Sequence, residues 1–149
     1  MSWRVIALGN PARGDDALGP LAAAALAKTF PHLPILHREA TILLLDDWQP
    51  ADSVLLIDAA APLGQPGRIH RLNLATDALP PTFSTATTHG FGLAETLHLA
   101  RALHRLPAHL ILYAVEGESF TFNTPLSPAA AAALPRLLER ITQELTQKA

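Results

Sequence analysis

Gly9-Asn-Pro-Ala-Arg-Gly-Asp-Asp-Ala-Leu-Gly19 is the stretch that decides the fold, because it joins a predicted strand to a predicted helix. The apolar run Val5–Leu8 before it predicts a buried strand. The alanine-rich run Leu21–Ala27 after it predicts a helix. In open α/β sheets, such corners lie at the carboxyl ends of strands, where ligands bind. The two adjacent carboxylates of this loop, Asp15 and Asp16, are therefore candidates for a functional site.

Strands and helices are expected to alternate along the rest of the chain. The segment Arg68–Leu74 alternates apolar and polar residues, which predicts an edge strand antiparallel to the others. The alternation as a whole predicts an α/β fold, a three-layer α/β/α sandwich with a mostly parallel, mixed sheet of about five strands. We expect a single domain over residues 1–149. The predicted strands are Trp3–Leu8, Ile35–His37, Ser53–Ile57, the antiparallel Arg68–Leu74, and His109–Val115.

Three long helices and a short one, Ile42–Trp48, are expected between the strands. The first runs from a cap at Asp15 or Asp16 to about Phe30. Ser127 followed by Pro128 is a strong start signal for the last helix, and Pro135 should kink or break it. The inward stripes are Leu93, Leu97, Ala100 and Leu103 in the helix Phe91–Leu106, and Leu134, Leu137, Leu138, Ile141 and Leu145 in the last.

Composition excludes several classes of function. The chain has no cysteine, so disulfides, thiolate metal sites and cysteine nucleophiles are absent. A net charge of −2 with scattered basic residues argues against nucleic-acid binding. No apolar run approaches the roughly 20 residues that cross a bilayer, and no signal peptide precedes the first strand. We expect a cytoplasmic monomer that binds neither nucleic acid nor membrane.

Three polar residues lie where the predicted loops should meet. Asp16 follows the first strand, Asp58 ends the third, and His89 lies just before the third long helix. A carboxylate at the end of a buried strand is costly unless it is paired, hydrogen-bonded or metal-bound. Two carboxylates and an imidazole form a mixed ligand set for a divalent ion, with positions left open. Spacing alone does not show that the three converge, because no local motif joins them.

Each of these residues also has a simpler interpretation. Asp15 is expected to cap the first helix, and for Asp16 capping or solvation is as good an interpretation as ligation. Asp58 could be a surface residue, although its apolar lead-in favours a cleft. His89 could stabilise the entry to its helix, where a neutral ring is favoured. Glu116, like Glu118, is expected in a solvated loop after the last strand.

The order of four motifs resembles the hydrogenase maturation endopeptidases, which process the large subunits of nickel-iron hydrogenases. The opening Gly-Asn-x-x-x-x-Asp-Asp pattern stands at Gly9–Asp16, and the family aspartate after an apolar strand is Asp58. The family histidine before a helix start is His89, in His-Gly-Phe-Gly-Leu. Glu118-Ser and Leu126-Ser-Pro give the closing pattern. The resemblance covers nearly all of the chain.

The resemblance implies an endopeptidase that removes a carboxyl-terminal extension from the large-subunit precursor after nickel has been inserted. It implies that Asp16, Asp58 and His89 form the catalytic, metal-contacting site, and that the nickel belongs to the precursor. The ion would polarise the scissile carbonyl, activate water, or serve only for recognition. The residues leave two other functions open: a non-catalytic module that binds the metal-loaded precursor, and a small-ligand-binding α/β domain.

One segment departs from the family pattern. Many members carry Asp-Gly-Gly-Thr after the second strand, whereas this chain has His37-Arg-Glu-Ala-Thr41. Without the glycines, a substrate tail approaches the backbone less easily. Arg38 and Glu39 are expected to bring charge to the same place. We expect this departure to affect substrate identity more than reaction type. The Gly-Asn-Pro-x-Arg-Gly-Asp-Asp form of Gly9–Asp16 and the altered segment together look more similar to the subgroup that serves soluble NAD-linked hydrogenases.

Overall fold

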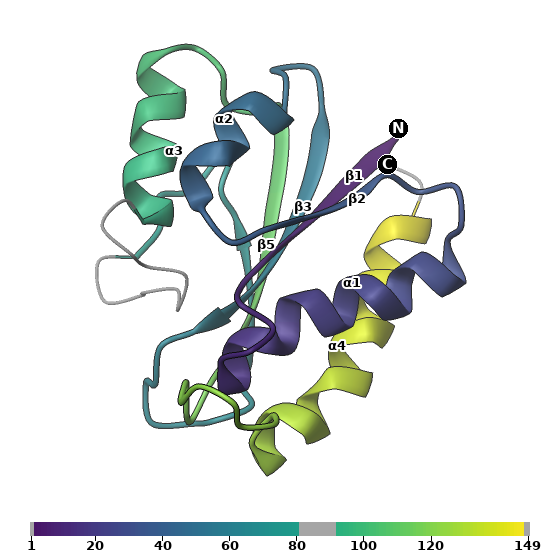
Figure 1. Ribbon diagram of the computed structural model, residues 1–149. Coiled ribbons are helices and arrows are strands. Elements are labelled where there is room, and N and C mark those ends of the chain that lie inside the picture. The colour runs from purple at the N-terminus through teal and green to yellow at the C-terminus, as the bar shows by residue number, and fades with distance from the viewer. Residues whose placement is uncertain (1, 81–91, 148–149) are drawn as a thin grey trace.

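The computed structural model describes residues 2–80 and 92–147, and it confirms the predicted α/β class. Figure 1 shows a central twisted sheet with helices on both faces. The strand order is β2-β1-β3-β5-β4, in which only β4 runs antiparallel to its neighbour. The antiparallel edge strand is therefore confirmed. The strands are β1 (Trp3–Leu8), β2 (Ile35–Arg38), β3 (Ser53–Ala60), β4 (Ile69–Asn73) and β5 (His109–Glu116).

Two helices cover each face of the sheet. α1 and α4 pack on one face, and α2 and α3 on the other (Figure 1). Two short 3₁₀ turns, η1 and η2, lead into α1 and α2. No helix in these two described ranges has the length and apolar character needed to cross a bilayer. The bounds are η1 (Gly14–Ala17), α1 (Leu18–Thr29), η2 (Thr41–Leu43), α2 (Leu44–Asp47), α3 (Leu93–Ala102) and α4 (Pro128–Thr146).

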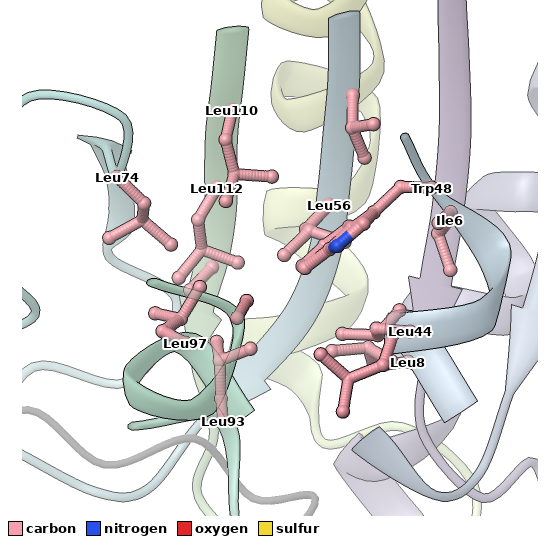
Figure 2. Packing of buried hydrophobic residues seen from close by; sticks show 14 of the residues in the cluster. Ile6, Leu8, Leu44, Trp48, Leu56, Leu74, Leu93, Leu97, Leu110 and Leu112 are labelled. Carbon is pink, nitrogen blue, oxygen red and sulfur yellow. The ribbon is translucent and has the colours of Figure 1, made fainter. Parts of the chain in front are cut away.

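Side chains that alternate along the strands build a separate core on each face of the sheet. In β1, Val5 joins the core under α1 and α4, whereas Ile6 joins the core under α2 and α3. Figure 2 shows the second core, where the fully buried Trp48 lies among leucines from the sheet and both helices. All eight residues of β3 are buried because this central strand is covered on both faces.

Two details of the helices differ from the sequence-based predictions. α4 continues through Pro135, so the predicted break is wrong. Leu137 and Ile141, beyond the proline, are fully buried against the sheet, and this packing maintains the helix. Leu103 is 52% exposed rather than inward, because α3 ends one residue earlier and the chain turns with a positive φ at His104.

The topology creates a switch point between β1 and β3. From β1 the chain crosses through α1 to β2 on one side, and then returns to β3 on the other side of β1. Ligands in open α/β sheets bind in the crevice at such a point, beyond the carboxyl ends of the strands. The packing there is close: a Cβ on Gly19 would lie 2.3 Å from the Leu8 carbonyl and 3.1 Å from that of Ile57.

A polar network ties the last turns of α4 to the sheet. Glu144 accepts hydrogen bonds from Arg71 Nε at 2.7 Å and from the Tyr113 hydroxyl at 2.8 Å. The Arg71 hydrogen bond is the main cause that lowers the pKa of Glu144 below its ordinary 4.5. Because the folded pKa is the lower one, this network contributes stability above pH 4.5 and loses it as the pH falls through the folded pKa.

Glu144→Gln should lower the free energy of unfolding at pH 7 by about 1 kcal/mol. The difference from the wild type should shrink in a series of urea titrations from pH 7 down to pH 3, since the wild-type carboxylate then takes up a proton. Glu139→Gln, on the exposed side of the same helix, is the control and should change little. A difference for Glu144→Gln that is constant over the series would contradict the prediction.

Candidate functional site

Asp16 is held in a fixed orientation just after β1. It is 2% exposed and lies in η1. Its Oδ2 accepts a hydrogen bond from the Asn10 amide at 2.9 Å and lies 3.8 Å from Arg13 Nη1. Gly9 has a φ of +135°, and a Cβ there would lie 2.1 Å from the Asp16 carbonyl oxygen. The glycine therefore lets the loop fold tightly back onto Asp16.

Asp58 lies within β3 rather than at its end. The strand continues to Ala60, and Asp58 pairs with Ala114 of β5. The side chain is fully buried, so its interpretation as a surface residue is wrong. Its Oδ1 accepts a hydrogen bond from the Ala59 amide at 2.8 Å. The strand runs further than expected because the alanines after Asp58 extend the ladder to β5. A fully buried carboxylate at this position is costly unless it has polar or metal partners.

The fold brings Asp16 and Asp58 to the same edge of the sheet. β1 and β3 are parallel neighbours, and η1 packs against β3. His89 lies outside the described residues, so its place in the site stays a prediction. Within residues 2–80 and 92–147, no three His, Asp or Glu side chains are grouped to hold a metal ion. The described site therefore consists of two buried carboxylates at the switch point.

Asp15 serves a different role from its neighbour. Its Oδ2 accepts hydrogen bonds from the amides of Glu118 at 2.8 Å and Ser119 at 3.3 Å. Ser127, the N-cap of α4, donates its amide to Oδ1 at 2.7 Å and its hydroxyl to Oδ2 at 2.8 Å. The prediction that Asp15 or Asp16 caps the first helix is wrong, since Ala17 precedes α1 without a side-chain cap. Asp15 instead places its charge at the favourable end of α4.

Glu116 is buried, which corrects the prediction of a solvated loop. It is the last residue of β5 and 1% exposed, whereas Glu118 is exposed as predicted. Its carboxylate accepts a hydrogen bond from the Gln65 amide and lies 3.8 Å from His70 Nε2. Burial, aided by Arg68, lowers the pKa of His70, and Glu116 opposes this shift. Glu116 thus fastens the β3–β4 loop at the site edge.

The segment that departs from the family pattern presents less charge than expected. Arg38 donates two hydrogen bonds of 2.8 Å to the carboxylate of Asp47, so it is paired with the end of α2. His37 donates from Nε2 to the Gly9 carbonyl at 2.6 Å. Glu39 is exposed. His37 therefore supports the loop that carries Asp16, a contact that its place after the second strand did not reveal.

The model of a protein family described as HycI, hydrogenase maturation protease, matches residues 39–144. The chain therefore belongs to the hydrogenase maturation protease family. A search of curated proteins found no match. Among solved structures, the hydrogenase maturating endopeptidase HybD from E. coli is 26% identical, with a TM-score of 0.75 over 97% of this chain and 92% of that one. The [NiFe] hydrogenase maturation protease HybD from Thermococcus kodakarensis is 22% identical and supports the fold, with a TM-score of 0.77 over 98% of this chain and 100% of that one.

Family membership defines the class of reaction. The protein is a hydrolase, an endopeptidase that processes a hydrogenase large-subunit precursor. The resemblance noted in the sequence is thus confirmed, and so is the expected fold.

Asp15→Asn should destabilise the protein by about 3 kcal/mol. An amide NH₂ in place of one carboxylate oxygen would face backbone donors and leave buried N–H groups unsatisfied. Asp77→Asn, at an exposed position, is the matched control and should stay within about 0.5 kcal/mol of the wild type. Urea unfolding measures both variants. Equal stability of Asp15→Asn and the wild type would show that the carboxylate does not hold the two loops.

Proposed function

We propose that the protein is a nickel-dependent endopeptidase in which Asp16, Asp58 and His89 contact a nickel ion carried by the precursor. The supporting observation is the position of two buried carboxylates at the switch point, Asp16 in the turn after β1 and Asp58 in the neighbouring parallel strand β3. This is the edge of the sheet where α/β proteins bind ligands. His89 enters through its place in the family motif.

The donor set suits an ion that arrives already held by another protein. Oxygen and imidazole nitrogen ligands accept first-row divalent ions. Three protein ligands leave coordination positions for the groups of the precursor. Nickel in this setting would polarise the scissile carbonyl, activate a water molecule, or serve only for recognition. Each of these roles makes cleavage conditional on nickel having been inserted, so the tail would be removed only from a loaded precursor.

The protein's own contribution is to orient the two carboxylates before the precursor binds. Asp16 is held by the Asn10 amide, and Asp58 by the Ala59 amide. Groups that are fixed in advance lose little entropy on binding and need little reorganisation during the reaction. The site thereby offers two carboxyl groups whose orientation is set by backbone donors.

Purified protein should shorten a nickel-loaded precursor and leave the nickel-free precursor intact, because the ion completes the site. Intact-mass spectrometry follows loss of the extension over time. Equal cutting of both forms would remove the nickel dependence. A stable complex with uncut cognate precursor, persisting through long incubation, would favour the non-catalytic binding module instead.

Asp16→Asn, Asp58→Asn and His89→Ala should each lower the rate of processing by about 100-fold or more, since each removes a group that contacts the ion. Asp77→Asn and His98→Ala alter exposed residues away from the site and serve as controls at the wild-type rate. Circular dichroism and thermal unfolding check that each variant is folded. A folded variant that processes at the wild-type rate would remove that residue from the site.

A further inference from the structure

Arg13 links the carboxylate of Asp16 to two aromatic rings. Its Nη1 lies 3.8 Å from Asp16 Oδ2, and its Nε donates to the Phe120 carbonyl at 3.2 Å. Its Cζ lies 5.9 Å from the centre of the Phe120 ring and 5.8 Å from that of Phe122. Such distances are typical of cation–π contacts. The side chain is 22% exposed, so most of it is enclosed by these partners.

The surroundings of Arg13 are fixed by several independent contacts. A Cβ on Gly117 would lie 2.4 Å from the tip of the Phe120 ring, so the missing side chain gives the ring its place. The amide of Asn123 donates to the Ala12 carbonyl at 2.7 Å. Asp15 holds the same two segments together through its four hydrogen bonds. The guanidinium group is therefore held in one orientation by a rigid frame.

Arg13 and the Asn10 amide act on the same oxygen of Asp16. Asn10 donates to Oδ2 at 2.9 Å, and Arg13 Nη1 lies 3.8 Å from the same oxygen. Two contacts to one oxygen fix the plane of a carboxylate and so determine where its second oxygen points. That second oxygen, Oδ1, lies over Gly9, 3.1 Å from where a Cβ would be. Arg13 thus contributes to the orientation of the Asp16 carboxylate.

We propose that Arg13 is a positioning residue for precursor cleavage, which holds Asp16 in the orientation that meets the nickel of the precursor. This inference rests on the proposed function of Asp16. The planar guanidinium is essential to it, because a lysine ammonium carries the charge but cannot contact both rings, donate to the Phe120 carbonyl and reach Asp16 in the same fixed geometry. A lysine at this position should therefore not replace Arg13.

A purely structural role for Arg13 leads to different expectations. If Arg13 served only to hold the 118–127 loop, its loss would lower stability and slow cleavage only through unfolding. Asp15 already fastens that loop. Replacement of Arg13 should therefore leave the thermal midpoint nearly unchanged while the reaction slows.

The test compares Arg13→Lys and Arg13→Gln with the wild type on nickel-loaded precursor. We expect kcat to fall about 10-fold in Arg13→Lys and about 100-fold in Arg13→Gln, with KM within about twofold, because orientation matters during the reaction. Arg71→Gln is the matched control: it breaks the ion pair with Glu144 but should cleave at the wild-type rate. In Arg13→Ala, added guanidinium ion at millimolar concentration should restore part of kcat.

Each other outcome overturns the inference in a recognisable way. A wild-type kcat in Arg13→Gln or in Arg13→Lys would remove the orienting role. A raised KM with unchanged kcat would make Arg13 a contact for the precursor instead. If Arg13→Gln unfolds, the kcat of Arg13→Lys and the guanidinium rescue of Arg13→Ala decide between the two roles. A less stable Arg13→Ala whose kcat guanidinium does not restore would assign a structural role to Arg13. If the wild type itself leaves loaded precursor uncut, the proposed function fails, whereas a cleaving wild type with unaffected variants refutes only the role of Arg13.

Discussion

The buried carboxylate of Asp15 is the interaction on which the site depends. It joins the loop after β1 to the segment after β5 and to the first turn of α4, with four hydrogen bonds from three residues. These elements come from opposite ends of the sequence. Asp16 and the rings around Arg13 lie on two loops that are also joined by backbone hydrogen bonds and by the contacts of Arg13, but Asp15 makes the largest set of hydrogen bonds between them. A carboxylate outside the candidate site thus helps to determine where Asp16 lies.

Asp15 and Asp16 are adjacent and have the same side chain, but they have different roles in the structure. Asp15 faces a helix end and is saturated by donors, whereas Asp16 faces the switch point beside β3. The family motif pointed to Asp16 rather than Asp15 for the site, but the sequence assigned Asp15 only a helix-capping role, because both aspartates fit the preference for acids near the start of a helix. Only the long-range contacts to Glu118 and Ser127 distinguish the two, and these contacts join segments more than 100 residues apart.

The fold was accessible from the sequence because its signals are local. An apolar run predicted β1, alternation of apolar and polar residues predicted the antiparallel edge strand, and Ser127 with Pro128 predicted the start of α4. The sequence-based predictions that were wrong failed because of tertiary contacts. β3 extends past Asp58 because β5 continues beside it, and Glu116 is buried because the β3–β4 loop folds over it. The placement of Asp16 and Asp58 at one edge followed from strand order, which periodicity does not encode.

Side-chain contacts hold α4 at both ends, and this bears on how the site loop meets a precursor. A carboxylate of the site loop secures one end of this helix, and Arg71 of β4 secures the other. The helix thus behaves as a brace that spans the molecule and resists displacement of the loop it supports. The precursor therefore meets a site loop that is already held in place, rather than one that folds around it. Under the proposed function, discrimination between nickel-loaded and nickel-free precursors would then depend on the shape and charge of the precursor itself.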